Sequence, residues 1–175
     1  MEIRIGAGGW AYFDIPGDDN LSSYAKGFDF VEVNSTFYDI PDYRVVESWR
    51  KKVPKNFEFS IRCHKSISHD YFLEQTPESI DSFNKMLDIC RILDSEYLHI
   101  LSPDKMKFNE DKIDLIKDFF SSFNLKGIRL VWEIRGLGKE LSTLLSEFMF
   151  DYNIIHCVDI STTNPLVDSD ILYTR

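Results

Sequence analysis

The chain has 175 residues, of which 43% are hydrophobic and 28% charged, so it can build one well-packed core and has no sign of disorder. Its formal net charge of −9 argues against a protein that coats nucleic acid, because basic residues drive binding to a phosphate backbone. No apolar run approaches the roughly 18 residues that a membrane span needs, and the charged start lacks the apolar segment of a signal peptide. We therefore expect one domain over residues 1–175, in the cytoplasm, with neither a membrane nor a nucleic-acid partner.

The cysteines are three in number and dispersed, at Cys63, Cys90 and Cys157, with no C-x-x-C pair. This pattern argues against a disulfide framework and against a zinc knuckle. Cys63 stands beside His64, but neighbours on a strand point to opposite faces, so the sequence predicts no catalytic cysteine–histidine pair.

Apolar, β-branched runs alternate with amphipathic stretches along the whole chain. Seven strands are predicted, over residues 3–7, 28–34, 57–63, 97–101, 128–134, 154–160 and 171–174. Helices are predicted between most of them, over residues 21–26, 43–53, 77–93, 110–123 and 139–152. Such alternation indicates parallel strands with right-handed crossovers. The glycine-rich start, Gly6 to Trp10, lacks the G-x-G-x-x-G spacing of a doubly wound nucleotide fold. We therefore predict an α/β protein with a parallel (β/α) TIM-type barrel.

Charged and polar side chains come in pairs, two residues apart, at the ends of several predicted strands. Residues two apart share one face of a strand, and here that face lies opposite the apolar set. The pairs are Glu32 with Asn34, Arg62 with His64, Glu133 with Arg135 and Tyr173 with Arg175, and Asp159 lies near the end of the sixth strand. Active sites of barrels are built at the carboxyl ends of the strands, so we expect these side chains to form one polar pocket.

Four segments of the chain carry a resemblance to a known family: Gly6–Tyr12, Glu32–Tyr38, the stretch from Phe59 through His69, and Trp132–Arg135. They resemble the YecE-like family, domain of unknown function 72, and the final Tyr173-Thr174-Arg175 is similar to its last matched strand. The resemblance implies a TIM-type barrel, distantly similar to the xylose isomerase-like barrels, and assigns no reaction. The chain has Arg62 where the family usually has lysine, and it ends near the seventh strand, which predicts an incomplete barrel of about seven strands. A homo-oligomer that covers the open edge is the expected protein partner.

The polar set favours an enzyme that acts on a small anionic molecule such as a sugar phosphate or an organic acid. Arginine and lysine would clamp the anion, and a carboxylate would act as general acid or base. The predicted catalytic residues are Glu133, Glu32 and Asp159. The predicted binding residues are Asn34, Arg62, His64, Lys65, His69, Arg135 and Arg175, with Tyr12 and Tyr38 as pocket walls.

Two other functions stay open at this point. A divalent-metal isomerase or endonuclease-like barrel would use Glu32, His64, Glu133 and Asp159 as ligands, although Arg135 beside Glu133 argues against it. His99 and His156 are expected to face the helices rather than the pocket. The third reading is a non-catalytic module that binds an anion or metabolite. The sequence identifies no cofactor, and no residue is assigned as a metal ligand.

Overall fold

A twisted, wholly parallel sheet organises the molecule in the computed structural model, which describes residues 2–136 and 142–175. Its strands in the described residues are β1 (Phe30–Val33), β2 (Glu58–Arg62), β3 (Tyr97–Ser102), β4 (Arg129–Ile134) and β5 (Ile155–His156). Each strand pairs with the next in the chain, in the order β1-β2-β3-β4-β5. The order never reverses, as it would in a doubly wound sheet, so the α/β barrel type of winding is confirmed.

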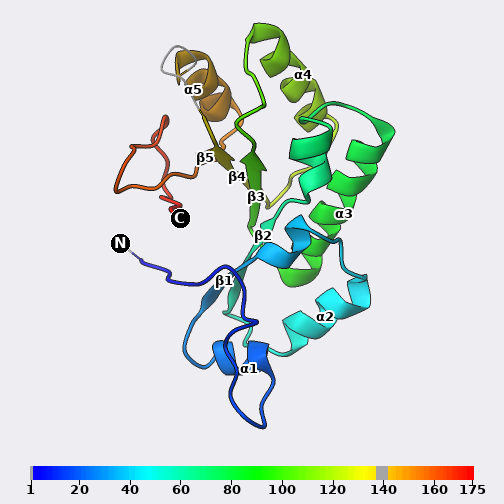
Figure 1. Cartoon of the computed structure of the whole chain (residues 1–175), viewed down its shortest axis with the longest axis vertical. Helices are drawn as coiled ribbons and strands as arrows, with labels where there is room; N and C mark the ends of the chain where they lie inside the picture. Colours follow the sequence, from blue (N-terminus) through cyan, green and yellow to red (C-terminus); the bar gives the residue numbers. More distant parts are fainter. Residues whose placement is uncertain (1, 137–141) are drawn as a thin grey trace.

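The helices connect the strands and lie where the amphipathic stretches predict them. They are α1 (Asn20–Tyr24), α2 (Tyr43–Lys51), α3 (Pro77–Leu93), α4 (Glu110–Ser121) and α5 (Ser142–Asp151), with short turns η1 (Asn34–Phe37) and η2 (Ser66–Asp70). Helices α2, α3 and α4 line one side of the sheet, and both chain ends lie on the other side (Figure 1). The start of the helix predicted over 139–152 falls outside the described residues. None of the helices described is both long and apolar enough to cross a membrane.

Helix α3 begins with a reciprocal capping box that its sequence supplies. The Thr76 side chain accepts a hydrogen bond from the backbone of Ser79, and the Ser79 hydroxyl accepts one from the backbone of Thr76. Pro77 occupies the first helical position, where no backbone donor is needed. The predicted bounds 77–93 are confirmed to the residue because both ends carry local signals: Asp94 ends the helix in the left-handed conformation.

Two of the seven predicted strands do not form as strands. Residues 3–7 run beside β1 but share one backbone hydrogen bond with it, from Glu32 N to Ala7 O at 3.0 Å. Near the chain end, Val158 and Thr174 form a single parallel bridge. Both segments therefore continue the winding of the sheet without a regular hydrogen-bond ladder, and the described residues form five strands rather than seven.

The sheet separates an apolar face from a polar one. The helix-facing core includes Val31, Phe59 and Trp132, all at most 1% exposed, and the Trp132 indole donates to Ser102 Oγ at 2.7 Å. The opposite face has a much smaller apolar cluster, formed by Val131, Ile155 and Cys157. That face also carries the polar side chains that form the site described below.

Glycine is required at position 6 by a close approach of two backbone segments. A Cβ atom on Gly6 would lie 2.3 Å from the carbonyl oxygen of Phe30 in β1. We expect Gly6→Ala to destabilise the protein by about 1–3 kcal/mol, because the backbone must move to relieve the overlap. Urea unfolding measures the change, with Gly27→Ala as the matched control, since a Cβ there meets nothing closer than 3.9 Å. Equal losses in the two variants would contradict the prediction.

Candidate functional site

A buried histidine between two glutamates forms the centre of the site. Three side chains project to the face of the sheet that lies away from the helices: Glu32 from β1, His99 from β3 and Glu133 from β4. Their immediate neighbours along each strand are apolar and point toward the helices. His99 Nδ1 lies 3.0 Å from Glu32 Oε2, and His99 Nε2 lies 3.5 Å from Glu133 Oε2. His99 is fully buried and Glu32 is 5% exposed. The carboxylates thus meet the ring at its two nitrogens, one on each side.

Two residues near the end of the chain, Tyr173 and Arg175, lie against this cluster. Arg175 donates from Nη1 to Glu133 Oε2 at 2.8 Å, and its Nη2 lies 3.2 Å from Glu32 Oε1. The Tyr173 hydroxyl lies 2.8 Å from Glu32 Oε2 and 2.9 Å from Ser60 Oγ, and the Tyr173 ring stacks on His99. Arg175 therefore links both carboxylates, whereas Tyr173 covers the histidine.

The charges of the cluster stabilise one another. Burial alone would lower the pKa of His99, but contacts with Cys157, Glu133 and Glu32 outweigh burial and raise it to about 10. Contact with His99 is the main reason that the pKa of Glu133 falls to about 2, and Arg175 lowers it further. Burial would raise the pKa of Glu32, yet His99, Arg175 and Tyr173 together lower it. The unliganded site at neutral pH therefore holds two carboxylates and an imidazolium.

Arg62 reaches the same region from the end of β2, but it is differently placed. Its Nη1 donates to Asn34 Oδ1 at 3.2 Å, and its guanidinium lies over the Phe37 ring, 4.5 Å from the centroid. Its Nε is buried without a hydrogen-bond partner in the described residues. Burial and the nearby Arg175 lower the pKa of Arg62. Arg62 is thus a buried cation that forms no ion pair with a carboxylate within the described part of the chain.

Asn34 holds Arg62 in place through the glycine-rich start of the chain. Its amide donates from Nδ2 to Gly8 O at 3.2 Å, while its other end accepts from Arg62. A Cβ on Gly8 would lie 2.2 Å from Asn34 Nδ2, so only glycine permits this contact. The structure therefore brings together Glu32, Asn34, Arg62, Glu133 and Arg175 of the predicted site residues.

Other predicted residues lie at or beyond the edge of this cluster. Arg135 is 56% exposed, with Nε 3.5 Å from Glu133 Oε1. His64 and His69 bond to Ser66 and Ser68 in and beside η2, and Lys65 is exposed. Asp159 lies exposed in a turn, where its Oδ1 accepts from Ser161. Tyr12 and Tyr38 are 102% and 68% exposed, so neither lines an enclosed pocket.

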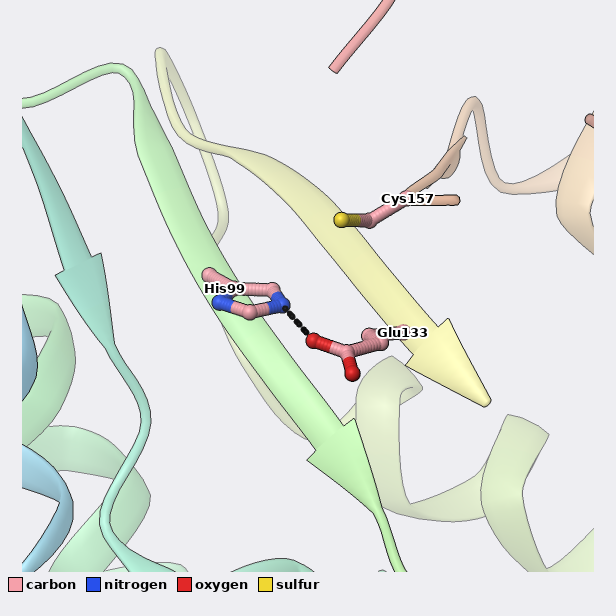
Figure 2. Close-up of side chains that lie close together, drawn as sticks. All are labelled: His99, Glu133 and Cys157. Atoms are coloured by element: carbon pink, nitrogen blue, oxygen red, sulfur yellow. Dashed lines mark ion pairs between the residues drawn. The ribbon is translucent and has the colours of Figure 1, made fainter. Parts of the chain in front are cut away.

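Two central residues were not predicted from the sequence. His99 was expected to face the helices, which is wrong: Leu98 and Ile100 take that face, so His99 points to the polar side. The same alternation, applied to β3, would have found it. His156 does face the helices, because it pairs in register with the core residue Trp132 and its Nδ1 accepts from Leu166 N at 3.0 Å. The second missed residue is Cys157, whose sulfur points toward His99 and Glu133 (Figure 2).

Comparison with known proteins places the chain in a family. The model of the family described as "Protein of unknown function DUF72" matches residues 4–169. The chain belongs to this family. The UPF0759 protein YecE of Escherichia coli (strain K12) is 33% identical over 67 residues, which cover 38% of this chain and 25% of YecE. The UPF0759 protein YunF of Bacillus subtilis (strain 168) is 27% identical over 103 residues, 55% of this chain and 36% of YunF. The resemblance to the YecE-like family is thereby confirmed, and the chain matches about a third or less of these curated relatives.

Solved structures support the same fold for this DUF72 chain. A DUF72 family protein from Enterococcus faecalis V583 superposes with a TM-score of 0.75 at 19% identity, over 90% of this chain and 61% of that one. D-psicose 3-epimerase from Clostridium cellulolyticum H10, solved with D-tagatose, gives a TM-score of 0.59 at 13% identity, over 97% of this chain and 67% of that one. At these identities the likeness concerns the fold alone, and it confirms the barrel-like architecture.

Proposed function

We propose that the site at the carboxyl ends of the strands is an enzyme active site for a small anionic substrate, such as a sugar phosphate or an organic acid. One observation carries the proposal: Arg62 is a buried guanidinium that is paired with no carboxylate in the described residues. A buried cation without a counter-ion costs stability, and an anionic ligand would supply the missing charge. The three free cysteines, all buried, suit a reducing compartment, so we place this activity in the cytoplasm.

Arg62 and Glu133 would then have different roles: Arg62 would bind the substrate, and Glu133 would act as the general base. Arg62 presents the planar donor fork that binds phosphate or carboxylate, and Asn34 fixes its orientation. Glu133 is 21% exposed, so a substrate held by Arg62 can reach it, and it is the candidate general base. Its low pKa makes it a weak base in the unliganded site, because Arg175 and His99 stabilise its charge. A substrate that draws Arg175 away would strengthen it.

Replacing Arg62 tests the binding half of the proposal. We expect Arg62→Met to abolish the rise in melting temperature that phosphate, sugar phosphates or di- and tricarboxylates cause in the wild-type protein. We also expect the unliganded variant to be at least as stable as wild type, because methionine fills similar space without the buried charge. Arg44→Met, on the exposed surface of α2, is the matched control. A wild-type protein that responds to none of these anions would contradict the proposal.

Catalysis is separated from simple binding by Glu133→Gln. For any anion that the wild-type protein converts, this variant should keep binding and lose turnover by about 100-fold or more, as expected for loss of a general base. Equal turnover in the two proteins would assign the site to binding or place the base elsewhere.

A further inference from the structure

Three potential metal ligands, His99, Glu133 and Cys157, lie close together in the site. The ligand atoms of His99, Glu133 and Cys157 all lie within 4.8 Å of one another, and each comes from a different part of the sheet: β3, β4 and the residue after β5 (Figure 2). His99 Nε2 and Glu133 Oε2 are 3.5 Å apart. Two ligands at tetrahedral angles around zinc, each about 2.0–2.3 Å from the ion, lie about 3.3–3.8 Å apart. The sheet thus holds this pair close to the spacing that zinc requires.

His99 supplies independent evidence for a ligand. Its ring is fully buried, and both nitrogens lack a hydrogen bond in the described residues, although carboxylate oxygens lie 3.0 and 3.5 Å away. These contacts have the distances of ion pairs but not the alignment of hydrogen bonds. A buried polar atom without an aligned hydrogen-bond partner lowers the stability of the fold, so the two nitrogens of His99 indicate a further ligand besides the two carboxylates.

Glu32 is placed as the outer partner of a metal-bound histidine. Its Oε2 lies at Nδ1, the ring nitrogen on the side away from Glu133. In metal sites a carboxylate at the second nitrogen of a ligating histidine fixes the tautomer and leaves the first nitrogen free for the ion. Tyr173 in turn bonds to the same oxygen, and Ser60 bonds to Tyr173, so the orientation of Glu32 is itself supported.

From this arrangement we infer that His99, Glu133 and Cys157 bind a divalent transition-metal ion of the zinc class. Thiolate, imidazole and carboxylate together favour zinc over magnesium or calcium, which prefer oxygen ligands. Three protein ligands leave one position for water or substrate, the pattern of catalytic rather than structural zinc sites. This ligand set differs from the one that the sequence suggested, because His64 bonds to Ser66 and Asp159 lies in an exposed turn.

Metal binding at this site needs no oxidant or reductant. A bond from a ring nitrogen of His99 and one from the sulfur of Cys157 to the ion replace the bond to any proton that these atoms carry, and such a proton passes to solvent. Arg175 can keep its bond to Glu133 Oε2, since each carboxylate oxygen has two lone pairs. A Glu133 that ligates the ion through Oε2 keeps Oε1 for the role of base proposed above, and the ion does not depend on Arg62.

Zinc binding to the metal-depleted protein tests the inference. We expect one Zn²⁺ per chain by elemental analysis after dialysis, and cobalt substitution should give the near-ultraviolet absorption of a thiolate-to-metal bond. Cys157→Ala should weaken zinc binding by more than about 100-fold, and Glu32→Gln by about 10–100-fold, as for other outer partners of ligands. Cys63→Ala, which removes a buried thiol on the helix-facing side, is the matched control and should bind as wild type does.

The outcomes are distinct from those of the anion site. Arg62→Met should keep its zinc, and Cys157→Ala should keep its response to phosphate. Failure of wild-type protein to bind zinc, or equal zinc affinity in the Cys157→Ala and Cys63→Ala variants, would overturn the inference. So would a cobalt protein without thiolate absorption. His99→Gln, which keeps a polar side chain of similar reach, serves as a second ligand variant and should also lose the ion.

Discussion

Replacing His99 with leucine is expected to lower the free energy of unfolding by about 3–5 kcal/mol, the cost of removing one partner from a buried ion pair. Leucine fills the volume of the ring but leaves Glu32 and Glu133 facing each other across an apolar side chain. Glu32 is 5% exposed, so water cannot replace the lost cation. Among the residues that the structure describes, Arg175 alone would still bridge the two carboxylates. Urea unfolding in the presence of EDTA measures the effect without a contribution from bound metal.

His156→Leu is the matched control for this loss. His156 is also buried, but its Nδ1 accepts from a backbone N–H and burial lowers its pKa, so it is a neutral ring. Its replacement should cost about 1–3 kcal/mol, for one unsatisfied backbone donor. A double variant, His99→Leu with Glu32→Gln, should lose less stability than the sum of the two single variants, because the second change removes a charge that the first leaves unpaired. Similar losses for His99→Leu and His156→Leu would contradict the ion-pair account.

The sequence allowed most of the fold to be predicted, since local signals and tertiary packing agree there. Helix α3 carries both its cap and its stop residue, and in β4 the apolar Leu130 and Trp132 face the helices whereas Glu133 faces the other side. Residues 3–7 and 171–174 failed as strands because regular pairing needs a neighbouring ladder, which hydrophobic periodicity does not report.

Alternation predicts the candidate site more reliably inside the strands than beyond their ends. It placed Glu32 and Glu133 on the correct face because both lie within regular β-structure. Beyond a strand end the outcome differs from residue to residue: Asn34 and Arg175 join the cluster, whereas His64 leads into the turn η2 and Asp159 starts a turn after the two-residue β5. His64 and Asp159 were expected in the pocket, and the structure places them elsewhere.

The contacts of His99 with Glu32 and Glu133 could not be predicted from the sequence, for a different reason. A single histidine between Leu98 and Ile100 is typical of a satisfied core residue, and its meaning depends on Glu32, which is 67 positions away in the chain. Likewise, Cys157 lies near His99 and Glu133 because β5 pairs with β4. Long-range contacts of this kind decide the chemistry, whereas local patterns decide the elements that carry it.

In metal-free protein, the ion pair between His99 and Glu133 should affect the pH dependence of stability at both the acid and the alkaline end. The pKa of Glu133 is about 2 in the folded state, below its value of about 4.3 in an unfolded chain, so its contribution is present above pH 4.3 and is lost as the pH falls toward 2. The pKa of His99 is about 10, above its unfolded value of about 6.5, so its contribution is complete below pH 6.5 and is lost as the pH rises through 10. We therefore expect the stability that the pair contributes to be greatest between about pH 4.3 and 6.5.

Glu133→Gln should remove most of the acid limb of this profile, a loss on the order of 3 kcal/mol between pH 5 and pH 2 for the wild-type protein. Denaturant unfolding at closely spaced pH values in EDTA measures it, with Glu47→Gln, on the exposed surface of α2, as the control that should leave the limb intact. The alkaline limb should shrink in the same variant, because Glu133 and His99 raise and lower each other's pKa through one interaction. A variant that lost only the acid limb would show that Glu32 alone holds the charge on His99.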